Sequence, residues 1–310
     1  MLWRKLGEGS LTINKSIIYL LLPLLLCCSR GGRDGELTVC FTGDVLLDRG
    51  VRKRIEYIGI DSLFSDAKPI FLSSDAVVIN LENPVTKRVS PLNKRYVFRA
   101  EPEWLPMLRK QGITHAAMAN NHTIDQGREG ITDTYNNLIA SDIVPIGYGV
   151  NQREACMPCI IKKNGVNVAI FNSFLLSVGD WELLENEAGI CQASVEKISG
   201  DIKAFKDYYP KYHAVAVLHW GIEYAKEPTE RQRTEARMLI DSGADAVIGH
   251  HPHVIQEEEY YNGAPIFYSL GNFVFDQRQD ENAAGMTVKL TFGKSNGIER
   301  CFVRIPVFNQ

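Results

Sequence analysis

The sequence predicts a mixed α/β fold whose sheets are buried. Short apolar segments alternate along the 310 residues with longer segments that have helical periodicity. Two pairs of apolar segments also flank Asn164-Gly165 and Asn262-Gly263, and Asn-Gly is typical of β-hairpin turns. Because helices and hairpins are interleaved with apolar strands, we expect a layered α/β architecture.

The first half of the chain alternates predicted strands with predicted helices. The predicted strands are residues 36–40, 75–79, 114–118 and 143–146. The predicted helices are residues 49–58, 102–111 and 128–141. Pro102 opens the second helix and Gly112 follows it, which is the usual placement of proline and glycine at helix ends.

The second half repeats this alternation and contains both hairpins. Its predicted strands are residues 159–162, 166–171, 214–218, 246–248, 254–260, 265–270, 285–292 and 299–308. Its predicted helices are residues 195–208 and 229–242. Thr229 and Gln232 have the spacing of a capping box, and Gly243 stops the last helix.

Residues that can bind a metal follow five of the apolar strands. In order they are Asp44, Glu82, Asn121 with His122, His219, and His251 with His253. In open α/β sheets, ligands gather beyond the carboxyl ends of the strands. A mixture of carboxylate, amide and imidazole groups suits one or two borderline divalent ions such as manganese, zinc or iron.

Each of these residues also has an ordinary structural interpretation. Asp44 or Asn121 can cap a turn or helix, His219 can be a core histidine, and Glu82 can pair with Arg99. Their joint placement at strand ends favours the metal site. The three histidines after one strand strengthen this interpretation, because a strand end fixes where the imidazole nitrogens point.

The N-terminal segment predicts export from the cytoplasm. Basic residues precede an apolar run at residues 17–26, and Cys27 and Cys28 follow. This pattern is typical of a secretory signal and is short for a membrane span. Leucines leading into cysteine are similar to a lipoprotein signal that would lipidate Cys27 or Cys28; an uncleaved anchor and an ordinary signal peptide are alternatives. We expect residues 1–28 to be the signal, 29–36 a linker and 37–310 the folded domain.

Charge and cysteine content argue against two other classes of protein. The formal net charge is −3 and no long basic run is present, so nucleic acid is not an expected partner. The five cysteines after the signal are scattered, which does not indicate a disulfide framework. Cys156 and Cys159 have the gap of redox and zinc motifs, but they lack a second pair. We interpret them as structural, and a disulfide between them is one such role.

Six short motifs occur in the order of a known family. They are residues 43–46, 80–84, 119–122 with Asp125 and Gly127, 219–224, 249–254 and 269–273. Over about residues 37–276 the chain resembles the CapA/PgsA family of capsule or poly-γ-glutamate synthesis proteins, a branch of the calcineurin-like metallophosphoesterases. The resemblance implies a four-layer α/β/β/α sandwich.

The resemblance also implies roles for some of the motif residues. The implied metal ligands are Asp44, Glu82, Asn121, His219, His251 and His253. The implied catalytic residue is His122, which matches the histidine that contacts phosphate. The implied substrate-binding residues are Asn80, Trp220, Glu223 and Asn272. Trp220 and Tyr224 can form an aromatic wall for substrate or belong to the core.

Two departures from the phosphoesterase pattern affect the expected chemistry. Leu46 stands where those enzymes carry a histidine, and Glu82 replaces an aspartate. We therefore expect unequal metal sites. The favoured function is a membrane-anchored, extracytoplasmic hydrolase of an envelope polymer or phosphoester, working with other capsule-synthesis proteins. The alternative is a non-catalytic component of a polymer assembly or export complex.

Overall fold

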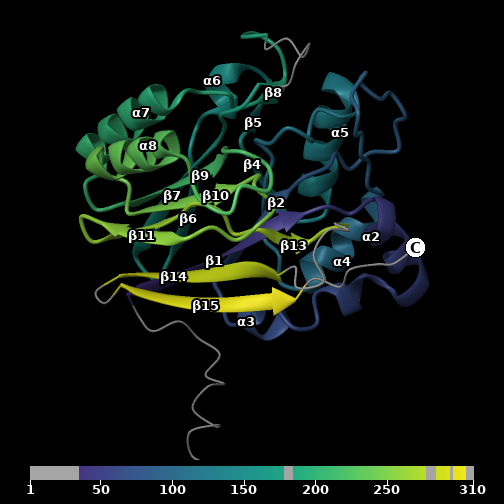
Figure 1. Ribbon diagram of the computed structural model, residues 1–310, viewed down its shortest axis with the longest axis horizontal. Coiled ribbons are helices and arrows are strands. Elements are labelled where there is room, and N and C mark those ends of the chain that lie inside the picture. The colour runs from purple at the N-terminus through teal and green to yellow at the C-terminus, as the bar shows by residue number, and fades with distance from the viewer. Residues whose placement is uncertain (1–34, 178–183, 277–283, 294–295, 305–310) are drawn as a thin grey trace, which may run out of the picture. The chain divides into compact units, whose positions relative to one another are not determined.

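Two β-sheets packed face to face form the centre of the fold (Figure 1). The computed structural model describes residues 35–177, 184–276, 284–293 and 296–304. The first sheet has the order β15 (Gly297–Arg304), β14 (Ala284–Gly293), β1 (Glu36–Val45), β2 (Ala76–Leu81), β3 (His115–Ala117) and β4 (Val144–Ile146), with β13 (Asn272–Val274) paired to β1. The second has the order β11 (Glu258–Tyr261), β12 (Ala264–Phe267), β10 (Ala246–His250), β9 (His213–His219), β7 (Val166–Phe174) and β6 (Cys159–Lys163). β5 (Tyr148–Gly149) and β8 (Gly189–Ile190) form a separate ribbon.

Apolar side chains fill the space between the two sheets. This inner core joins Phe41 and Val78 of the first sheet to Val215 and Ile248 of the second. β2 and β10 are buried at every residue, as expected for parallel strands that are covered on both faces. Such strands have continuous apolar sequences, which explains why the sequence predicted them.

Helices cover the outer face of each sheet and complete four layers. α7 (Val195–Tyr208) and α8 (Glu230–Asp241) lie side by side on the second sheet and share a core with β10 (Figure 1). The helices that share a core with the first sheet are α2 (Arg49–Ile58), α3 (Lys68–Leu72), α4 (Leu105–Lys110) and α5 (Gly127–Ala140). The remaining short helices are η1 (Ile60–Leu63), η2 (Pro102–Trp104) and α6 (Gln152–Ala155). The predicted four-layer α/β/β/α sandwich is confirmed.

Local sequence signals act as predicted at the hairpins and at α8. Asn164-Gly165 and Asn262-Gly263 connect antiparallel pairs, β6 with β7 and β11 with β12. At the start of α8 the Thr229 hydroxyl accepts from the Gln232 backbone N–H, and the Gln232 side chain accepts from the Thr229 N–H. The last predicted strand is β15, and residues 305–308 of that prediction lie outside the described residues.

The cysteines pair differently from the local disulfide considered above. Cys156, after α6, forms a disulfide with Cys191, after β8, across a Cα separation of 4.8 Å. Cys159 is a free thiol at the start of β6. Cys191 is brought to this position because its N–H bonds the Gly147 carbonyl, and its carbonyl accepts the Phe174 N–H. Tertiary pairing of β5 with β8, rather than sequence spacing, therefore selects the partner.

The N-terminal predictions lie outside the part of the chain that the structure describes. These are the signal at residues 1–28, the cysteines Cys27 and Cys28, and the linker up to residue 34. β1 begins at Glu36, inside the predicted linker. Within the described ranges, no helix is both long enough and apolar enough to span a membrane.

Candidate metal centre

Parallel strands bring the predicted ligands to one edge of the two sheets. β1 and β2 run parallel, so Asp44 near the end of β1 lies close to Glu82, which directly follows β2. β9 and β10 also run parallel, and they end in His219 and His250 at the same register. Sheet geometry therefore gathers side chains that are far apart in the sequence.

The deepest part of the site is a cluster of Asp44, Glu82 and His253. All three are buried, and each offers one ligand atom within 4.8 Å of the others. His253 Nδ1 lies 3.0 Å from Asp44 Oδ2, and His253 Nε2 lies 3.6 Å from Glu82 Oε1. Because the Asp44 carboxylate can only accept, Nδ1–H donates to it and Nε2 is directed at Glu82. Asn80 Nδ2 donates to Asp44 Oδ1 at 2.8 Å and fixes the other oxygen.

The two buried carboxylates give this cluster a negative charge that protons balance when no ion is bound, and a divalent ion would displace those protons. Burial and the nearby Asp44 carboxylate raise the pKa of Glu82 well above its usual range. Burial lowers the pKa of His253, but the Glu82 and Asp44 carboxylates outweigh this effect and raise the pKa to about 9. Glu82 Oε1 has no hydrogen-bond partner among the described residues. A buried carboxylate oxygen without a partner is costly, and a divalent ion would satisfy it.

A second group of predicted ligands adjoins Glu82. His219 Nε2 lies 2.8 Å from Asn121 Oδ1, 3.2 Å from His251 Nδ1 and 4.0 Å from Glu82 Oε1. Burial first, and then neighbouring histidines, lower the pKa of His219 well below its usual value. Burial and His253 lower the pKa of His251 to about 3. Both are thus held as neutral imidazoles, the form that binds metals.

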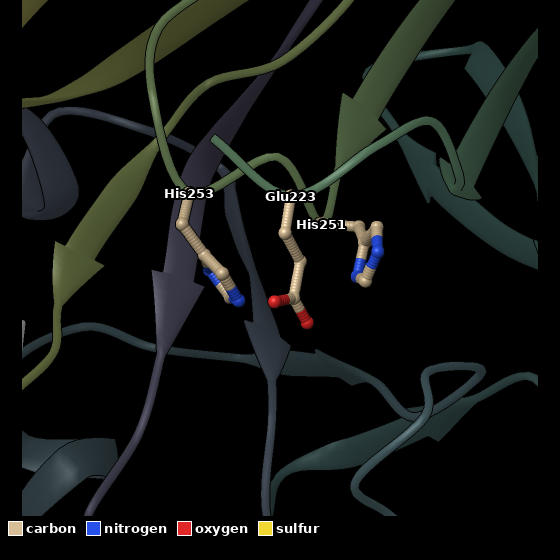
Figure 2. A group of neighbouring side chains, drawn as sticks. All are labelled: Glu223, His251 and His253. Atoms are coloured by element: carbon tan, nitrogen blue, oxygen red, sulfur yellow. The ribbon is translucent and has the colours of Figure 1, made fainter. Parts of the chain in front are cut away.

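Glu223 joins the site as a further candidate ligand. Figure 2 shows its carboxylate between the imidazoles of His251 and His253. One ligand atom from each lies within 4.8 Å of the others. The sequence implied only substrate contact for Glu223, because a residue in the loop after β9 has no strand periodicity to place it. The available signal was that Glu223 belongs to the motif at residues 219–224.

The position of the absent histidine is apolar. Leu46 is fully buried and packs with Phe98 and Phe275. The Phe275 ring centroid in turn lies 4.6 Å from that of His253. Leu46 therefore packs in the core where a ligand was expected, and the carboxylate near His253 comes from Glu223 instead.

The predicted catalytic residue His122 is oriented by Asp125. His122 Nδ1 lies 2.8 Å from Asp125 Oδ2, which also accepts the Phe98 N–H at 2.8 Å. Because the carboxylate accepts, Nδ1 carries the proton and Nε2 is left for another partner. Burial lowers the pKa of His122 and Asp125 partly opposes this. The sequence left Asp125 without a role, although the three-residue spacing after His122 was visible.

The other predicted substrate-binding residues have supporting positions. Asn80 and Asn272 are buried, and Asn272 Oδ1 lies 3.0 Å from His253 Nδ1. Trp220 belongs to the core, the second of the two alternatives, and its assignment to substrate binding is corrected, because it is 1% exposed and its Nε1 donates to the Tyr268 carbonyl. It packs there because the glycine at position 249 leaves room for the indole, whose Nε1 would lie 2.6 Å from an added Cβ.

Two structural alternatives to the metal site do not hold. Arg99 pairs with Glu101 at 3.0 Å, so it is not the partner of Glu82. Asp44 caps no helix, since Asp48 accepts the N–H of Arg49 at the start of α2. His250, by contrast, has a structural role, because its Nε2 lies 2.9 Å from the Thr42 carbonyl and joins the two sheets.

Solved structures share this fold at low sequence identity. A putative 5′-nucleotidase from Staphylococcus aureus, in complex with α-ketoglutarate, matches 89% of this chain and 55% of its own, with 13% identity and a TM-score of 0.57. The calcineurin-like phosphoesterase YfkN from Bacillus subtilis matches 87% of this chain and 91% of its own, with 15% identity and a TM-score of 0.55. These likenesses establish the fold alone.

Sequence relatives establish the family. The PGA biosynthesis protein CapA of Bacillus subtilis (strain 168) is 37% identical over 249 residues, which are 79% of this chain and 64% of the relative. The capsule biosynthesis protein CapA of Bacillus anthracis is 33% identical over 250 residues, which are 78% of this chain and 60% of the relative. The chain thus spans less than two thirds of these relatives. The family model described as bacterial capsule synthesis protein PGA_cap matches residues 38–277. This chain belongs to the PGA_cap family of bacterial capsule synthesis proteins.

Proposed function

We propose that this protein is a metal-dependent hydrolase, anchored outside the cytoplasm, that acts on an anionic envelope polymer or its phosphoester precursor. The observation that carries the proposal is the buried Glu82 Oε1, which lacks a hydrogen-bond partner among the described residues and faces His253. A core carboxylate kept in this state serves no packing purpose. It is explained if the position holds a cation.

The residues present fit one or two divalent ions. Asp44, Glu82 and His253 would hold one ion, and the group around His219, Asn121 and His251 offers ligands for another. Nitrogen and oxygen donors of this kind suit manganese, zinc or iron. A bound ion supplies Lewis-acid stabilisation of negative charge on substrate oxygens.

The protein's own residues supply orientation and proton transfer. Asn80 and His253 fix the two oxygens of Asp44, so the carboxylate cannot rotate away. Asp125 fixes the His122 ring and its tautomer. In this proposal His122 acts as a general acid in its imidazolium form, which the Asp125 carboxylate favours: Nε2–H gives its proton to the leaving group, and the ring is left neutral with the Nδ1 proton held by Asp125.

The names of the relatives support the substrate class. Two are named for capsule or PGA biosynthesis, which supports an envelope polymer as the substrate. We extend this to the present chain as a proposal: its substrate is an anionic polymer of the envelope, made together with other synthesis proteins. The N-terminal cysteines would attach it to the membrane by lipid.

A non-catalytic component of a polymer assembly or export complex is the second candidate. Leu46 favours it, because a buried apolar side chain stands where a phosphoesterase would carry a histidine ligand. Such a protein would keep the fold and a metal as a binding module without hydrolysis.

One experiment separates these candidates. The full-length protein is purified in detergent without chelator, and its metal content is measured by mass spectrometry. Hydrolysis of bis(p-nitrophenyl) phosphate and of a γ-linked glutamate oligomer is then followed before and after chelation. The hydrolase proposal expects bound metal and chelator-sensitive cleavage of at least one probe. Bound metal without cleavage of either probe supports the binding module, and no bound metal contradicts both candidates.

A further inference from the structure

Four bulky residues near the metal centre have left-handed backbone conformations. Among the described residues seven non-glycine residues have positive φ. Three of them are Asp142, Asn164 and Asn262, residue types that tolerate this conformation. The others are Arg49 at 57°, Tyr224 at 63°, His251 at 100° and His253 at 59°. Strain of this kind concentrates at functional sites, and Arg49 and Tyr224 are the two members that have no role in the site described above.

An acidic residue and two aromatic rings contact the Arg49 side chain. Its Nε lies 3.3 Å from the buried Asp276 carboxylate, which also accepts the Gly50 N–H at 2.9 Å. The guanidinium carbon lies 5.9 Å from the ring centroids of both Tyr96 and Phe98. The two Nη atoms have no hydrogen-bond partner within the described ranges, and 38% of the side chain is exposed. Arg49 therefore presents an oriented, partly neutralised cation to solvent.

Contacts place Arg49 beside the reacting groups. The Phe98 ring under the guanidinium lies 4.3 Å, centroid to centroid, from the His122 ring. Tyr224 lies 6.1 Å from His253 by the same measure, and its backbone N–H is fixed by the Pro252 carbonyl.

A second guanidinium, that of Arg95, lies over the same tyrosine ring as Arg49. The segment from residue 87 to 99 contains five basic residues. Four of them have carboxylate partners: Lys87, Arg88, Lys94 and Arg99. Arg95 has no ion pair among the described residues, and its guanidinium carbon lies 5.2 Å from the Tyr96 centroid. The half-exposed Tyr96 ring thus carries two guanidinium groups, Arg49 and Arg95.

We propose that Arg49, Tyr96 and Arg95 form an oxyanion subsite that binds successive carboxylates of an anionic polymer next to the metal centre. This inference rests on the proposed function and names the residues that select its substrate. A guanidinium binds a carboxylate through two parallel hydrogen bonds, and stacking on an aromatic ring fixes its plane. Arg49 binds the group nearest the scissile bond, and Arg95 binds the next one along the chain.

The test measures binding and catalysis separately. The metal-loaded full-length protein is titrated with a γ-linked glutamate decamer by calorimetry, and with inorganic phosphate as the alternative oxyanion. Arg49→Gln is expected to weaken decamer binding about 10- to 100-fold, the effect of losing a charge-assisted pair. Arg49→Lys keeps the charge but loses the fork geometry, and it should not restore wild-type affinity. Arg95→Gln should weaken binding less and reduce its dependence on salt.

Matched controls exclude a structural explanation. Arg153→Gln removes an exposed arginine outside the subsite and should leave decamer binding unchanged. Metal content and melting temperature should be unchanged in Arg95→Gln, whose side chain is exposed. In cleavage assays Arg49→Gln should raise KM more than it lowers kcat, because the subsite binds substrate outside the reacting bond.

The outcomes distinguish this inference from the proposed function. Decamer binding that depends on Arg49, in a protein that cleaves nothing, would support the subsite and contradict the hydrolase. Cleavage with unchanged decamer affinity in Arg49→Gln and Arg95→Gln would overturn the subsite and keep the hydrolase. Tighter binding of phosphate than of the decamer would also overturn it as a polymer carboxylate site.

Discussion

Replacing Glu82 with glutamine should have opposite consequences for the metal-free and metal-bound protein. Without an ion, burial and Asp44 raise the pKa of Glu82, so the carboxyl group is held towards its neutral form. Glutamine has nearly the same volume and is neutral, so the metal-free variant should melt no lower than the metal-free wild type. With an ion, the variant lacks a charged ligand and should bind metal at least about 100-fold more weakly.

The size of the thermal effect follows from linkage. An ion at 100 times its Kd stabilises the folded state by about 2.7 kcal/mol. For a domain of this size each kcal/mol corresponds to roughly 2 °C, so manganese or zinc should raise the wild-type melting temperature by about 5 °C. At the same concentration the Glu82→Gln variant should gain less than about 1 °C.

Differential scanning fluorimetry with and without metal measures both quantities. Glu56→Gln is the matched control, because Glu56 is exposed on α2, and it should behave as wild type. The reasoning is refuted if metal-free Glu82→Gln loses several degrees while its response to metal stays at the wild-type value. That result would make Glu82 an ordinary structural carboxylate.

Four further predictions test separate parts of the site and chain. Glu223→Gln should lower the affinity for a second ion at least about tenfold in a metal titration, whereas Glu227→Gln in the same loop should not. His122→Ala should keep its metal and lose hydrolysis by about 10²- to 10⁴-fold; loss of metal would instead make His122 a ligand. Replacing both Cys27 and Cys28 with alanine should abolish lipid labelling and release the protein from membranes on fractionation, and unchanged labelling would contradict the lipoprotein prediction. Burial raises the pKa of Asp245, but hydrogen bonds from His213, the Ala214 N–H and Lys206 outweigh this effect and hold the pKa below its usual range. The charged Asp245 side chain therefore stabilises the fold above about pH 4, and this stabilisation is lost as the pH falls through its lower pKa in the folded state. The difference in melting temperature between wild type and Asp245→Asn should be largest at neutral pH and should shrink in acid.

The parts of the fold that depend on local patterns were predictable from the sequence. β2, β9 and β10 are continuous apolar runs because both of their faces are covered, and the polar residues after them marked the site edge. The Thr229 capping box and the Asn-Gly turns involve only neighbouring residues, so the local sequence was enough to predict their geometry.

The parts that depend on tertiary register were not predictable. The Cys156–Cys191 disulfide spans 35 residues and arises from the pairing of β5 with β8. Glu223 reaches the histidines from a loop without periodicity, and the burial of Trp220 depends on the space over Gly249. The left-handed backbone of Arg49 is set by its surroundings and leaves no sequence signal, since arginine does not favour that conformation.

The most direct test of the central claim is a crystal of the protein soaked in manganese and measured at the manganese absorption edge. The cation-site account predicts an anomalous peak at roughly 2.0–2.3 Å from Glu82 Oε1, with His253 or His219 among the other ligands. Glu82 Oε1 would then no longer lack a partner. No peak at this position, with Glu82 Oε1 hydrogen-bonded to an ordered water or a protein donor, would contradict the account.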